Sequence, residues 1–119
     1  MNKYKNKKIE IDDFVFDSKA EAQRWQQLKL LEKVGQIGNL RRQVKYVLIP
    51  SQKIDGKTVE RECAYYADFC YFRNGELIAE DVKGYRKGPA YQLFAIKRKL
   101  MLERYGIRVK EITKAEIWK

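Results

Sequence analysis

Apolar residues dominate two strand-length segments between Ala64 and Gly88, and Asn74-Gly75 joins them. An Asn-Gly pair between two such segments is a strong short-range signal for a β-hairpin. Near-continuous apolar strands are typical of sheets that are covered on both faces. Four charged residues interrupt this pattern, namely Asp68, Glu80, Asp81 and Lys83. Because a buried charge is costly unless it is paired, these side chains are expected to face partners or a ligand.

Hydrophobic periodicity and capping signals predict the remaining elements. A helix begins after Ser18, which forms a capping box with Glu21, and it ends at Gly35. The other predicted elements are a β-ribbon at 9–16, a strand at 40–49, a turn at Asp55-Gly56, a helix at 89–105 ended by Gly106, a strand at 107–112 and a short helix capped by Thr113 and Glu116. The order of helix, three strands, helix and strand predicts an α/β fold with one mixed sheet flanked by helices.

The length of 119 residues suits one domain with a single core. Residues 1–8 are polar and basic, which predicts a loose N-terminal arm and shows no signal-peptide pattern. No apolar run approaches the ~20 residues that a membrane span needs. We therefore expect a single cytoplasmic domain with no membrane partner.

The charge of the chain points to a polyanion. It carries 26 Lys and Arg against 16 Asp and Glu, a formal net charge of +10. Such an excess in a small domain favours nucleic acid as the partner. The alternative is a basic protein without a polyanionic partner. An anionic membrane is a weaker alternative, because the sequence contains no basic amphipathic helix.

Missing residue types narrow the chemistry. The absence of histidine excludes Ser-His-Asp triads, Cys-His dyads and His-ligated metal sites. Cys63 and Cys70 form no CxxC pair, and we expect small buried thiols in a reducing compartment rather than zinc ligands. No Gly-rich motif for a nucleotide cofactor occurs. Carboxylates, lysines, tyrosines and a hard metal ion remain available for catalysis.

A two-residue turn at Asn74-Gly75 brings two carboxylates together. Asp68 then lies opposite Asp81, with Cβ atoms roughly 4.5–5.5 Å apart, and Lys83 shares the face of Asp81. Two carboxylates ~4 Å apart repel by about 4 kcal/mol at an effective dielectric constant of about 20, a conflict that a magnesium ion removes. Two alternatives stay open. Lys83 or an arginine neutralises the pair as a buried ion cluster, or a three-residue loop places Glu80 opposite Asp68.

Three further polar residues bear on this constellation. Glu21 lies within the apolar stripe of the first helix, so it is either an ordinary capping carboxylate or a third group of the site. Lys97 lies on the inward face of the second helix, where it either extends past the core to water or contacts a phosphate. Gln43 lies opposite Asp68 if Asp55-Gly56 turns a regular hairpin.

The segments SKAEAQRW, YADFCYF and EDVKG, with a lysine-bearing second helix, resemble the PD-(D/E)xK nuclease superfamily and its restriction-endonuclease-like core. Within it, the chain is similar to phage-encoded proteins related to TnsA-type transposon endonucleases and Holliday-junction resolvases. The resemblance covers residues 16–112, and helix glutamate, hairpin aspartates and lysine occur in the superfamily's order. Ala67 stands where the superfamily's name has proline, at a position that varies.

The resemblance implies a metal-dependent DNA endonuclease. Asp68 and Asp81 would hold magnesium, which manganese can replace, Glu21 would join the site, and Lys83 would position or activate the attacking water. A resolvase-like homodimer that selects branched DNA is implied, as is a subunit that needs a protein partner in a recombination or transposition complex. A phage-encoded protein would act in the cytoplasm of a bacterial host.

The residues expected to follow the DNA backbone are Arg41, Lys45, Tyr85, Arg86, Lys87, Lys97 and Arg98. The rival function is a non-catalytic nucleic-acid-binding module on the same fold. The acid-acid-lysine set argues against it, because a pure binder has little reason to cluster carboxylates near phosphates.

Overall fold

The computed structural model of the chain describes residues 8–12, 14–84 and 86–117. Residues 1–7 of the expected arm and Tyr85 lie outside the described residues. The elements in chain order are β1 (Ile9–Ile11), β2 (Phe14–Phe16), α1 (Lys19–Lys33), β3 (Gly38–Ile49), β4 (Gln52–Ile54), β5 (Lys57–Glu60), β6 (Cys63–Arg73), β7 (Glu76–Val82), α2 (Pro89–Tyr105), β8 (Lys110–Ile112) and α3 (Lys114–Ile117). No helix within these ranges is long and apolar enough to cross a membrane.

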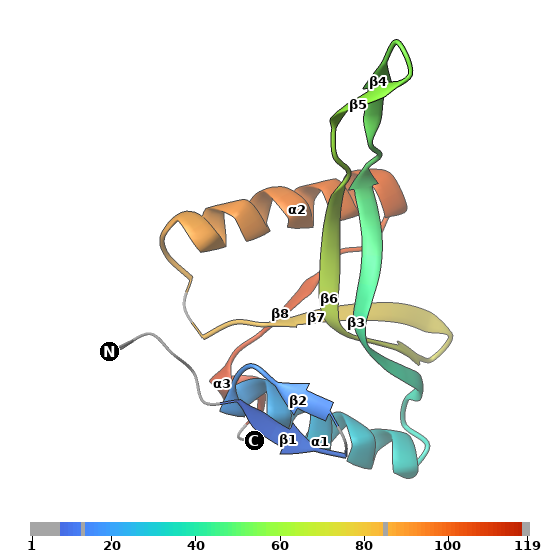
Figure 1. The fold of residues 1–119 in the computed structure, drawn as a ribbon. Coiled ribbons are helices and arrows are strands. Elements are labelled where there is room, and N and C mark those ends of the chain that lie inside the picture. The colour runs from blue at the N-terminus through green and yellow to red at the C-terminus, as the bar shows by residue number, and fades with distance from the viewer. Residues whose placement is uncertain (1–7, 13, 85, 118–119) are drawn as a thin grey trace.

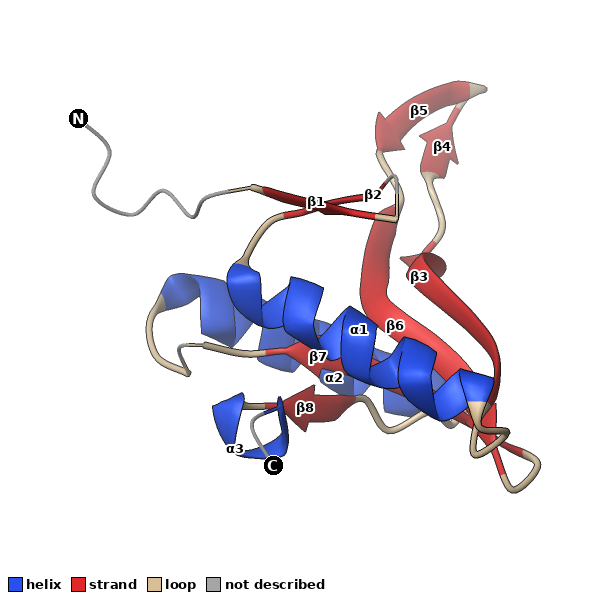
Figure 2. Ribbon diagram, turned by 90° about the horizontal axis from the view of Figure 1, so that it is seen from below, coloured by secondary structure: helices blue, strands red, loops and turns tan. Residues whose placement is uncertain are grey.

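A four-stranded sheet forms the centre of the fold, with the strand order β3-β6-β7-β8. The first three strands are antiparallel, and β8 runs parallel to β7. The helices α1 and α2 cover opposite faces of this sheet (Figures 1 and 2). The predicted α/β architecture with a mixed sheet between helices is therefore confirmed, although β8 is shorter than the strand predicted at 107–112.

Each face of the sheet has its own apolar layer. Trp25 and Leu28 of α1 pack with Phe69 and Tyr71 of β6. On the other face, α2 contributes to a layer formed by Leu48, Tyr65, Ala67, Cys70, Ala79, Phe94, Met101 and Val109. Both strands of the β6–β7 hairpin are therefore covered on both faces, as their near-continuous apolar sequence predicts.

The hairpin between β6 and β7 has the predicted register. Asn74 and Gly75 both have positive φ, at 52° and 77°, as a two-residue hairpin turn requires. Arg73 pairs with Glu76, and the ladder continues to the pair formed by Phe69 and Glu80. This register rules out the three-residue loop, so Asp68 and Asp81 come next along their strands. A second ribbon, β4–β5, turns at Asp55-Gly56 as predicted and projects from the sheet (Figure 1).

The predicted helix ends are confirmed. The backbone N–H of Glu21 donates to Ser18 Oγ at 3.1 Å, and Gly35 follows α1 with a φ of 81°. In the short terminal helix, Glu116 Oε2 accepts hydrogen bonds from both the N–H and the hydroxyl of Thr113, each at 2.6 Å. The start of α3 is thereby fixed against the end of β8.

A buried ion pair fastens α1 to the sheet. Glu80 of β7 is fully buried, and Arg24 of α1 is 8% exposed. The guanidinium binds both carboxylate oxygens, with Nε–Oε1 at 2.8 Å and Nη2–Oε2 at 2.5 Å, and the Tyr71 hydroxyl donates to the same carboxylate. Such a two-point contact fixes orientation as well as distance. Glu80 therefore faces an arginine that the sequence analysis did not single out.

This pair yields a test of what holds α1 in place. Arg24→Met should lower the free energy of unfolding by about 3–5 kcal/mol, because it leaves the buried Glu80 carboxylate without its cation. The double variant Arg24→Met/Glu80→Leu should recover much of that loss, because no buried charge remains. Urea unfolding followed by circular dichroism measures both values.

The matched control is the exposed pair of Lys29 and Glu32 on the same helix, 3.5 Å apart. Lys29→Met should cost less than about 1 kcal/mol, because solvent screens that contact. An equal cost for Arg24→Met and Lys29→Met would show that the buried pair does not hold the helix.

Candidate active site

A cleft of about 530 Å³ lies where the start of α1 meets the middle of β6 and the end of β7. We call it the carboxylate cleft. Its lining residues are Asp17, Ser18, Lys19, Ala20, Glu21, Gln43, Asp68, Asp81, Val82, Gly84 and Lys114. The helix α1 and the β6–β7 hairpin thus bring Glu21, Asp68 and Asp81 to one hollow.

A local break in the sheet directs Asp68 into this cleft. Residues two apart on a regular strand share a face, yet Ala67 packs in the layer under α2 and Phe69 in the layer under α1. Opposite Asp68, Gln43 of β3 has a φ of 51°, an uncommon value for a residue other than glycine. Irregularities of this kind re-aim side chains next to functional sites.

The Asp68 carboxyl is held by three groups. Its Oδ1 accepts from Gln43 Nε2 at 3.3 Å, which confirms that Gln43 lies opposite Asp68. Its Oδ2 accepts from the backbone N–H of Val82 at 2.8 Å. The third group is the Glu21 carboxyl, which shares a hydrogen bond with it. Glu21 therefore reaches the sheet, beyond its backbone role in capping α1.

Proximity of the carboxyls changes their protonation. Burial, then the nearby charges of Asp81 and Glu21, raise the pKa of Asp68 to about 9. Burial also raises the pKa of Glu21, which the hydrogen bond with Asp68 offsets only in part. Their hydrogen bond raises the pKa of Asp68 and lowers that of Glu21, which corresponds to Asp68 as the donor and Glu21 as the acceptor. The repulsion between Asp68 and Asp81 that the sequence predicts thus contributes to the raised pKa of Asp68.

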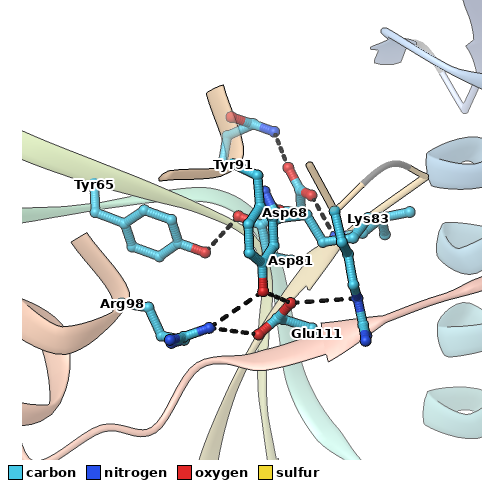
Figure 3. Close-up of polar contacts among 10 residues, drawn as sticks. Tyr65, Asp68, Asp81, Lys83, Tyr91, Arg98 and Glu111 are labelled. Atoms are coloured by element: carbon cyan, nitrogen blue, oxygen red, sulfur yellow. Dashed lines mark hydrogen bonds and ion pairs between the residues drawn. The ribbon is translucent and has the colours of Figure 1, made fainter. Parts of the chain in front are cut away.

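Asp81 has partners for both of its oxygens. Its Oδ2 accepts from the Tyr65 hydroxyl at 2.6 Å (Figure 3), and its Oδ1 lies 3.0 Å from Lys83 Nζ. The Lys83 ammonium also lies 3.6 Å from the centre of the Phe94 ring. Burial and the charge of Asp81 raise the pKa of Tyr65, so its hydroxyl remains a donor. Asp81 and Lys83 share a face as predicted, and Lys83 neutralises Asp81 in this structure.

Glu111 of β8 gathers a second group of polar residues beside Asp81, its partner in the parallel register. Its carboxylate accepts from the Tyr91 hydroxyl at 2.8 Å and from Arg98 Nη1 at 2.9 Å (Figure 3), and Arg86 Nε lies 3.5 Å away. Burial alone would raise the pKa of Glu111, but the hydrogen bonds from Tyr91 and Arg98 bring it below its usual value. Two arginines expected on DNA are thus ion-paired within the protein.

The remaining residues expected on DNA are spread over the molecule. Lys45 pairs with Glu62 at 2.5 Å on the exposed side of β3, and Arg41 is exposed on the same strand. Lys97 is half-buried on α2. Lys87 lines a second hollow, together with Arg86 and Lys83. Within the described ranges, none of these expected contacts lines the carboxylate cleft itself.

Three contributors to the site were not predicted. Arg24 lies three residues after Glu21, so it shares the inward face of α1. An arginine within the apolar stripe of this helix was the sequence feature that could have indicated a buried ion pair. For Tyr65, the sequence supports only the general expectation that a buried tyrosine hydroxyl has a hydrogen-bond partner. Glu111 carried no signal, because the sequence does not reveal that β8 pairs in parallel with β7.

Stability in the absence of a metal ion should fall as the pH rises. The pKa of Asp68 is about 9 in the folded protein against an ordinary value of 3.8, so between these values the folded state holds a proton that the unfolded chain has released. The contribution of Asp68 to stability is therefore complete below the lower value and decreases by up to about 1.4 kcal/mol per pH unit toward the upper one. Urea unfolding in EDTA across this window measures the slope.

Asp68→Asn is the matched variant, because asparagine keeps the size of the side chain and still accepts from Val82. It should show a much shallower slope over the same window. Identical slopes for the two proteins would mean that Asp68 is not the group that holds the proton.

Comparison with known proteins gives a match to one family model. No curated protein and no solved structure matches the chain. The family match extends over residues 1–119, and the family is described as "Protein of unknown function (DUF1064)". The chain belongs to the DUF1064 family.

Proposed function

We propose that this protein is a metal-dependent nuclease that hydrolyses phosphodiester bonds in DNA, on a restriction-endonuclease-like fold of the PD-(D/E)xK superfamily. The observation that carries the proposal is the meeting of Glu21, Asp68 and Asp81 in one cleft, with Lys83 Nζ 3.0 Å from Asp81. These are the four residues that the sequence resemblance assigns to catalysis. Their convergence from α1, β6 and β7 supports that assignment.

The donor set of the cleft suits magnesium or manganese, which prefer carboxylate oxygens and water. Burial and the nearby charges of Asp81 and Glu21 raise the pKa of Asp68, and a divalent cation among these carboxyls would offset both causes. As they stand, the described His, Cys, Asp and Glu side chains form no group of three that could hold a metal ion. A bound cation would be held by Glu21, Asp68 and Asp81, with the Asp68 carboxyl deprotonated. A bound magnesium ion would lower the pKa of the attacking water and neutralise charge on the scissile phosphate.

The chain's own residues would orient this chemistry. Tyr65 holds one oxygen of Asp81, and Gln43 and the Val82 N–H hold the two oxygens of Asp68. Lys83, now paired with Asp81, would be released to donate a hydrogen bond to the attacking water or to a phosphate oxygen. Its contact with the Phe94 ring limits how far the ammonium can move.

DNA as the substrate is supported by the net charge of +10, since phosphate contacts dominate the affinity of such proteins. The described elements include no zinc finger and no second domain that could read base edges. We therefore extend the proposal to weak sequence preference and to selection of DNA by its structure. A homodimer that presents two clefts to opposite strands would provide such selection.

The second candidate function is a non-catalytic nucleic-acid-binding module. One observation favours it, because both oxygens of Asp81 already have protein partners. In that case the Lys83–Asp81 pair is a permanent buried ion pair, and magnesium has no effect on the protein.

Magnesium or manganese should raise the melting temperature of the protein. The ion would bind the folded state alone, which stabilises that state increasingly as the ion concentration exceeds Kd, and the increase should grow with pH because binding releases the Asp68 proton. Asp68→Asn or Asp81→Asn should abolish the increase, whereas Glu103→Gln, at an exposed position on α2, should preserve it. A melting temperature that neither ion changes at millimolar concentration would favour the non-catalytic module.

Cleavage and binding should separate in the Lys83→Ala protein. Single-turnover cleavage of branched, duplex and single-stranded DNA in magnesium should slow by at least about tenfold. Affinity for the same DNA in EDTA should change little, because one cation among many is lost. The control is Lys57→Ala on the exposed β5 strand, which should cut at the wild-type rate. Undiminished cleavage by Lys83→Ala would make this lysine structural.

A further inference from the structure

A second hollow adjoins the carboxylate cleft. It measures about 510 Å³, and we call it the basic hollow; its lining residues are Lys83, Gly84, Arg86, Lys87, Thr113, Lys114 and Ala115. Gly84 and Lys114 line both hollows. The two hollows are therefore neighbours, separated by the segment that follows β7 and by the start of α3.

The two hollows have opposite charge. The carboxylate cleft has four carboxylates in its lining, from Asp17, Glu21, Asp68 and Asp81, against two lysines. Every charged side chain that lines the basic hollow is a cation. Lys83 is paired with Asp81 and Arg86 with Glu111, which leaves Lys87 and Lys114 without an ion pair among the described residues. The lining of the hollow therefore carries a net positive charge.

The backbone around Lys114 is fixed before any ligand arrives. Glu116 binds both the N–H and the hydroxyl of Thr113, and the Lys83 N–H donates to the Ile112 carbonyl at 2.7 Å. This last bond ties the end of β7 to the end of β8. The backbone segments that carry Lys83 and Lys114, both of which line the hollow, are thereby held together by the same short connection.

We propose that the basic hollow binds a phosphate of the nucleic-acid strand next to the phosphate that occupies the carboxylate cleft, and that Lys114 is its main contact. The inference rests on the proposed nuclease function and names the path of the strand. Successive phosphates follow each other every ~3.4 Å of helix axis, which suits two hollows that share lining residues. Lysine ammonium groups act as point charges for phosphate. Lys114, which the sequence analysis did not select, would place the strand across both hollows.

Lys114→Gln tests the contact through the salt dependence of binding. Fluorescence anisotropy in EDTA measures affinity for labelled duplex DNA over a series of salt concentrations. Loss of one phosphate contact should make the slope of log affinity against log salt shallower by about one. Lys57→Gln, on the exposed β5 strand, is the matched control and should leave the slope nearly unchanged. Equal slopes for the two variants would overturn the proposal.

A second measurement locates the phosphate. A single neutral methylphosphonate is moved along the strand, one position per duplex, and each duplex is tested with the wild type and with Lys114→Gln. At one position beside the cleavage point, the neutral group should weaken wild-type binding, and Lys114→Gln should add no further loss. Additive losses at every position would contradict the contact.

The outcomes separate the two proposals. A protein that binds DNA through Lys114 but never cleaves it in magnesium would remove the nuclease function and retain the basic hollow. Normal cleavage with no effect of Lys114→Gln would overturn the hollow alone. Poly-glutamate that binds the wild type but not Lys114→Gln, with no binding of DNA, would overturn the phosphate site in favour of an acidic protein partner.

Discussion

The position of α1 depends on the buried contact between Arg24 and Glu80. Arg24 follows Glu21 by three residues on the inward face of the helix, and Glu80 directly precedes Asp81 on β7. The two-point contact between guanidinium and carboxylate therefore sets the height and rotation of Glu21 relative to Asp81. Any other position of α1 would leave the buried Glu80 carboxylate without its cation, which is strongly destabilising. The charge of Glu80, which is unexpected in an apolar strand, therefore specifies how α1 packs on the sheet.

The second constraint is the break in the sheet at Gln43 and Asp68. It interrupts the alternation of β6, ends its ladder with β7, and turns the Asp68 carboxyl toward Glu21. The site then contains three neighbouring carboxyls, which raise the pKa of Asp68, and an ion pair between Asp81 and Lys83. A divalent cation would replace both the Asp68 proton and the lysine, which frees Lys83 for the phosphate or the water.

Much of the fold could be predicted from the sequence, because turn residues, capping residues and helical spacing determine the bounds and register of its elements. Asn74-Gly75 fixed the register of the hairpin, Ser18 and Gly35 bounded α1, and the helical spacing of Glu21 turned it toward the sheet. The rest depends on contacts between distant segments. The parallel pairing of β8, and with it the place of Glu111, has no local signal. The Tyr65 contact with Asp81 depends on the break at Asp68, which ordinary strand alternation does not anticipate.

The central claim is that Glu21, Asp68 and Asp81 form one divalent-cation site. Crystals of the protein grown with manganese, with diffraction data collected at the manganese absorption edge, test it most directly. The account predicts one or two anomalous peaks between these three carboxylates, with Lys83 moved away from Asp81 Oδ1. Manganese elsewhere on the surface, with the cleft empty and the Lys83–Asp81 contact still at 3.0 Å, would contradict it.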